Sequence, residues 1–115
     1  EEWTHRAHLT AGFWYVRKLG ATRALDEMRT RIRMHNESVG TANTDASGYH
    51  ETITCLYLAA IATHLEEHPQ LEFADSLRTL LESDLSDSRW PLRFYSRERL
   101  FSPQARRSWV EPGSL

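Results

Sequence analysis

The stretch from His50 to His68, HETITCLYLAAIATHLEEH, decides the fold of this chain. Its apolar residues recur three and four positions apart, the spacing that places side chains on one face of an α-helix. The residues expected to face inward are Ile53, Leu56, Tyr57, Ala60, Ile61, His64 and Leu65. Pro69 ends the pattern, because a proline disfavours the helical conformation of the residue before it. We therefore expect a central core helix here.

Three further helices are expected around this one. Residues 4–19 and 21–38 both show helical periodicity, and Gly20 between them ends the first helix. A fourth helix is expected over residues 71–82. Residues 40–48 lack periodicity and are rich in turn-forming residues, so they are expected to form a loop.

The last third of the chain is expected to be irregular. Residues 83–88 read as a polar connection, and Ser102 followed by Pro103 favours a short helix that continues to about Val110. No strand-like alternation is present in the sequence. The expected fold class is all-α: one helical domain over residues 1–115, a bundle of about four main helices with an irregular C-terminal segment and a short final helix.

Composition limits the possible partners and the compartment. The 115 residues are 40% hydrophobic and 26% charged, with a formal net charge of −2. This balance gives no overall electrostatic reason to expect nucleic acid or an anionic membrane as partner. A single cysteine, Cys55, fits a reducing compartment, and no apolar run approaches the roughly 20 residues of a membrane span. A cytoplasmic location is expected.

Three motifs carry chemistry-bearing side chains: WTHRAHL at residues 3–9, YHETIT at 49–54 and YSRERLFSPQAR at 95–106. Together they resemble a family of small, uncharacterised bacterial all-helical proteins, over nearly the whole chain. The resemblance implies that His5, His8, His50, Glu51 and residues 95–106 belong to the family signature. It implies no activity, so chemistry has to be argued from the residues.

The histidines are expected to meet at one end of the bundle. If the second helix is antiparallel to its neighbours, the first and third helices start at the same end. His5 and His8 are three residues apart and can address one point, and His50 and Glu51 lie at the start of the third helix. These four side chains form a candidate ligand set for zinc or another divalent first-row metal.

Other interpretations of the same four residues stay open. Helix N-termini carry a positive field, which opposes a metal ion and favours a small anionic ligand beside the imidazoles and Arg6. A His50–Glu51 or His5–Glu51 pair could serve as a general acid or base, although no nucleophile indicates a reaction class. A structural or protein-interaction module, in which these are ordinary helix-end residues, is the remaining alternative.

Arginines and aromatic residues alternate in residues 89–109, a pattern compatible with stacking on single-stranded nucleic acid. The acidic residues upstream favour neutralisation within the fold instead. The aromatic residues expected to be buried against the bundle are Trp90, Phe94, Tyr95 and Phe101. Arg97 and Arg106 are candidates to brace buried carboxylates, Glu51 among them.

Overall fold

The helices follow the sequence pattern closely in a computed structural model that describes residues 2–113. The elements, in chain order, are α1 (Glu2–Leu19), α2 (Ala21–Ser38), α3 (Glu51–Glu67), α4 (Phe73–Leu81), the 3₁₀ turns η1 (Asp84–Ser86) and η2 (Trp90–Arg93), α5 (Arg97–Leu100) and α6 (Pro103–Arg107). Residues 2–113 contain no strand, so the all-α prediction is confirmed. No helix within that range has the length and apolar character needed to cross a membrane.

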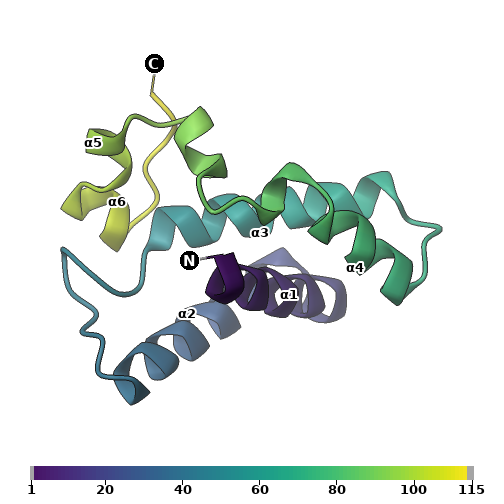
Figure 1. The fold of residues 1–115 in the computed structure, drawn as a ribbon, viewed down its shortest axis with the longest axis horizontal. Coiled ribbons are helices and arrows are strands. Elements are labelled where there is room, and N and C mark those ends of the chain that lie inside the picture. The colour runs from purple at the N-terminus through teal and green to yellow at the C-terminus, as the bar shows by residue number, and fades with distance from the viewer. Residues whose placement is uncertain (1, 114–115) are drawn as a thin grey trace.

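Helices α1 and α3 run in the same general direction, and α2 returns between them in sequence (Figure 1). A single residue, Gly20, joins α1 to α2 with a φ of +84°, a left-handed conformation that glycine adopts without steric penalty. Its N–H donates to the carbonyl of Val16, which satisfies one of the free carbonyls at the end of α1. Because the connection is one residue long, α2 turns back and packs against α1.

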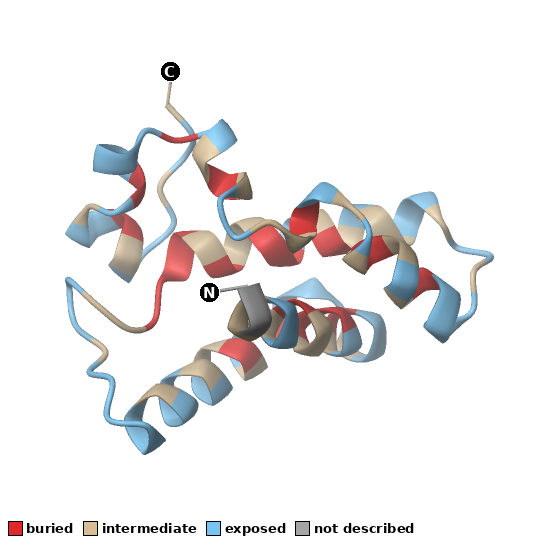
Figure 2. Ribbon diagram, in the orientation of Figure 1, coloured by how far each residue is buried: buried red, intermediate tan, exposed pale blue. Residues whose placement is uncertain are grey.

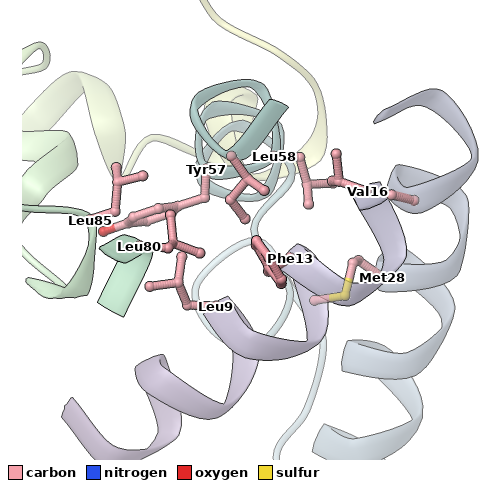
Figure 3. Close-up of a cluster of buried hydrophobic side chains, with 10 residues drawn as sticks. Leu9, Phe13, Val16, Met28, Tyr57, Leu58, Leu80 and Leu85 are labelled. Atoms are coloured by element: carbon pink, nitrogen blue, oxygen red, sulfur yellow. The ribbon is translucent and has the colours of Figure 1, made fainter. Parts of the chain in front are cut away.

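The core lies where α1, α2, α3 and α4 meet. Phe13 of α1 is fully buried there, among Leu9, Met28, Leu58 and Leu80 (Figure 3). Because α4 and the residues after it bring Leu80 and Leu85 to the same cluster, one core joins all four main helices.

Helix α3 is buried around much of its circumference (Figure 2). Tyr57 and Ile61 are buried as expected, but Leu58 is also buried, whereas Leu56 is only half-buried. A single inward stripe was therefore too narrow a prediction. The bundle covers one side of α3 and α6 contacts another, so polar positions such as Thr52 are also enclosed.

The C-terminal segment folds over the start of α3 (Figure 1). Ser102 caps α6 as expected, its hydroxyl accepting from the N–H of Ala105, but that helix ends at Arg107 rather than near Val110. Tyr95 is 1% exposed, as expected for an anchor.

The prediction of buried aromatic residues was wrong at two positions. Phe94 is 38% exposed and Phe101 is 44% exposed. The reason is that the 3₁₀ turn η2 and the one-turn helix α5 each bury one side only. Trp90, Pro91 and Leu100 occupy those buried or half-buried sides.

The loop over residues 40–48 is tied to the bundle through Asn43. The Asn43 side-chain oxygen accepts from the Asn36 amide and from the N–H of Tyr49, and its own amide donates to the carbonyl of Arg33. This polar side chain thereby links the end of α2 to the start of α3.

Candidate functional site

The imidazoles of His5 and His50 are committed to different backbone carbonyls. His5 Nε2 donates to the carbonyl of Leu85 at 2.8 Å, and its ring lies against Tyr57 with the two ring centroids 4.7 Å apart. His50 Nε2 donates to the carbonyl of Leu100 at 2.6 Å, while its Nδ1 accepts from the N–H of Ile53. His5 therefore fastens α1 to η1, and His50 caps α3.

The expected meeting of His5, His8 and His50 is not seen, and the register of the helices explains why. His5 lies beside Tyr57, which follows His50 by seven residues on α3. At about 1.5 Å of rise per residue, that displacement is about 10 Å along the helix axis. The parallel direction of α1 and α3 was the correct expectation, but their ends are not level.

Glu51 belongs to a separate buried cluster. Its carboxylate accepts from Nε and Nη2 of Arg29 on α2, from the Tyr49 hydroxyl at 2.7 Å and from the Cys55 thiol at 3.4 Å. The two-point contact with Arg29 lowers the pKa of Glu51 to about 2, and burial raises the pKa of Cys55 to about 11. The carboxylate is ionised and its bonding capacity is used.

The metal interpretation receives no support from these positions. No group of three or more His, Cys, Asp or Glu side chains among residues 2–113 is arranged to hold a metal ion. Of the four candidate ligands, His5 and His8 share a cavity wall, whereas His50 and Glu51 each have other partners. Arg29, rather than Arg97 or Arg106, braces Glu51; Arg106 donates to the carbonyl of Gly48, and Arg97 is exposed.

His5 and His8 line a small cavity between α1, α2 and α3. The cavity has a volume of about 90 Å³, and its remaining lining residues are predominantly apolar: Leu9, Gly12, Met28, Ile32, Ile53, Thr54, Tyr57, Leu58 and Ile61. The Thr54 hydroxyl donates to the carbonyl of His50, and the Tyr57 hydroxyl donates to the carbonyl of Asp87. The interior therefore suits an apolar group.

A second, more open pocket of about 280 Å³ lies on the α1–α2 surface next to this cavity. His8, Met28 and Ile32 line both spaces. The outer pocket adds two polar side chains from α2, Arg31 and His35. The side chain of His8 thus lines both the inner cavity and a largely apolar outer pocket that also carries Arg31 and His35.

His8 lines both spaces, and its ring keeps its bonding capacity. Among the described residues, none is hydrogen-bonded to its ring, and the nearest ring is that of His35, with centroids 6.3 Å apart. Burial, followed by the neighbouring imidazoles of His35 and His5, lowers the pKa of His8. The ring is therefore neutral near pH 7 and able to accept or donate one hydrogen bond.

The sequence located part of this site. His5 and His8 were candidates, and Met28, Ile32 and His35 lie on the helix that was expected over residues 21–38. Arg29 was missed as the partner of Glu51 because it belongs to a run of charges that reads as solvated. Its position directly after the buried Met28 is the signal that places it at the edge of the packed face.

Comparison with protein-family models, curated proteins and solved structures finds no match to this chain. The family resemblance drawn from the three motifs therefore stays a prediction, and the function has to be inferred from the geometry of the site.

Proposed function

We propose that this protein binds a small amphiphilic anion at His8, with the apolar part of the ligand in the inner cavity and its carboxylate or phosphate in the outer pocket. The observation that carries the proposal is the position of His8 between these two spaces, without a hydrogen-bond partner among the described residues. His35 supplies a further ring at the mouth, and Arg31, which pairs with Glu27 at 3.4 Å, keeps further N–H donors there.

The sizes of the two spaces fit this division. A cavity of about 150 Å³ is known to hold a benzene-sized molecule, so an interior of about 90 Å³ takes a short aliphatic chain, and an aromatic ring would need space from the outer pocket as well. Ligand pockets generally occupy about 300–1,000 Å³. Rotation of the His8 side chain would join the inner cavity to the outer pocket and bring the site close to that range.

The pH dependence separates an anion from a metal. An anion stabilises the protonated imidazole, so its binding raises the pKa of His8 and is accompanied by proton uptake. The affinity for an anion should therefore rise as the pH falls through about 6.5. Protons compete with a metal for the same imidazole, so metal affinity would fall over that range.

Butyrate, hexanoate and benzoate, with 1-butanol and 1-hexanol as uncharged counterparts, provide the test by ¹⁵N–¹H NMR titration between pH 7.5 and 5.5. We expect saturable binding of the acids with dissociation constants of about 0.1–1 mM at pH 6, with the largest shifts at His8, Met28 and Ile32. The affinity of the acids should increase by up to about tenfold per pH unit on acidification.

The variant His8→Gln should lose this pH dependence, whereas His68→Gln, at the far end of α3, should retain it. His35→Gln, with the helical fold checked by circular dichroism, provides a second variant at the mouth. Equal affinity for acids and alcohols, or shifts that map away from the α1–α2 surface, would overturn the proposal.

A further inference from the structure

The outer face of α1 carries cations that have no acidic partner within residues 4–113. Residues 4–19 contain no Asp or Glu, although the chain as a whole has a net charge of −2. Arg6, Arg17 and Lys18 are exposed, and no ion pair joins them to an acid within residues 4–113. Arg17 instead lies over the ring of Phe73 and Lys18 over that of Trp14. Among residues 4–113, no acidic side chain compensates this local charge.

Between these cations the helix surface is hollowed and apolar. An open trough of about 520 Å³ is lined by Arg6, Ala7, Thr10, Ala11 and Trp14, and we call it the α1 trough. Its floor consists of small side chains, and Trp14, 44% exposed, forms one end. The first turns of α1 lie at the front of the molecule, with no other element over them (Figure 1).

The apolar surface continues on the other side of Arg6. A groove of about 410 Å³ separates α1 from α4, and its apolar lining comes from Phe73, Ala74, Leu77 and Leu81. Arg6 lines both the groove and the α1 trough. Arg78 and Glu82, which also line the groove, are paired with one another at 3.6 Å, whereas Arg6, which lines both spaces, has no acidic partner within residues 4–113.

We propose that the α1 trough docks an acidic amphipathic helix of a partner protein. Small residues let two helix axes approach to about 8 Å, and Trp14 offers the aromatic anchor that interfaces favour. Arg6 and Lys18 are about 18 Å apart along the helix axis, so carboxylates near the two ends of a partner helix of similar length can reach both. The α1 trough shares Ala7 and Ala11 with the outer pocket beside His8, but Arg6 and Trp14 do not line that pocket, so variants at those two residues test docking separately from ligand binding.

Charge excludes the simplest alternative occupants of the trough. In a second copy packed against the same face, antiparallel helices would place Arg6 of one copy beside Arg17 and Lys18 of the other, which is repulsive. Single-stranded nucleic acid carries a charge on every nucleotide and calls for cations along its whole path. Here Arg6 is the cation that lines the trough, and Lys18 lies over the ring of Trp14.

The test uses a synthetic 18-residue helical peptide with a Leu/Ala stripe flanked by Glu, and the same peptide with Lys in place of Glu. We expect the Glu peptide to bind the full chain saturably, with NMR shifts along residues 6–18, and the Lys peptide not to bind. Because exposed charges contribute, the affinity should fall as salt is raised from 50 to 500 mM.

Arg6→Glu and Trp14→Ala should each weaken binding of the Glu peptide by about tenfold. Ala7→Gln fills the trough and favours the helix, so it should weaken binding in the same way. It takes the place of Trp14→Ala if that variant perturbs folding. Arg23→Glu and Trp109→Ala remove an equally exposed arginine and tryptophan elsewhere and should leave the affinity unchanged.

Three outcomes would overturn the proposal: failure of the Glu peptide to bind, equal binding of the Lys peptide or of oligo(dT), or self-association of the chain that is lost in Ala7→Gln. Shifts that map to residues 89–109 instead of the α1 trough would also reject it, because the exposed Phe94 and Phe101 would then be the docking surface.

Discussion

Glu51 at the start of α3 is held by Arg29 of α2 through two parallel N–H donors, across 22 positions of sequence. The Glu51 side chain is 10% exposed and that of Arg29 is 40% exposed, so removal of the arginine strands a mostly buried carboxylate. This pair adds a polar link between two helices that also pack together in the core.

Arg29→Ala is expected to lower the free energy of unfolding by about 2 kcal/mol, because Glu51 then keeps only its contacts with Tyr49 and Cys55. Arg29→Lys should recover part of the loss, since it restores the charge without the two-point contact. Urea denaturation monitored by circular dichroism measures both. Arg23→Ala, an exposed arginine on the same helix, is the control, and an equal loss there would refute a specific role for Arg29.

Protonation of His50 is expected to lower the stability of the native state in acid. Both ring nitrogens are used in the neutral form, since Nε2 donates to Leu100 and Nδ1 accepts from Ile53, and burial lowers the pKa of His50. The unfolded state therefore binds a proton more readily than the native state, and stability decreases as the pH falls below about 6.5.

His50→Asn tests this expectation, because asparagine can still cap α3 but cannot titrate. The difference in urea midpoint between pH 7.5 and 5.5 should be smaller in the variant than in the unmodified chain. Some acid sensitivity will persist, since burial also lowers the pKa values of His8 and His64. An unchanged pH difference would show that His50 does not contribute.

Gly48 is expected to be far less replaceable than Gly40. Both have a φ near +83°, but a Cβ on Gly48 would lie 2.5 Å from the carbonyl oxygen of Ala42, whereas one on Gly40 would meet nothing within 4 Å. Gly40→Ala should cost about 1 kcal/mol of backbone strain. Gly48→Ala should cost more than that, because the Asn43-centred loop must also move. Equal changes in thermal midpoint for the two variants would contradict the steric argument.

The sequence predicted those features of the fold that depend on neighbouring residues. Periodicity located the four main helices, Gly20 the break between the first two and Ser102 a cap, because each depends on a few adjacent residues. The level at which α1 meets α3 depends on distant packing of Phe13, Leu58 and Leu80, and no local pattern encodes it. Hence the expectation that His5 and His50 are neighbours was wrong, because it rested on the helix direction alone.

The last prediction concerns the C-terminal residues after α6. Thr52 is fully buried, and its hydroxyl donates to the carbonyl of Ser108 at 2.9 Å while accepting from the N–H of Val110 at 3.1 Å. The Tyr95 hydroxyl donates to the carbonyl of Val110 at 2.6 Å, so Val110 is fastened on both sides. Thr52→Val keeps the shape of the side chain but removes both hydroxyl contacts. It should cost about 1–2 kcal/mol and raise the hydrogen-exchange rate of the Val110 amide by about tenfold or more. Thr63→Val on the exposed side of α3 is the matched control. If the Val110 amide exchanged at the same rate in both variants, the fastening of this segment would have to come from Tyr95 alone.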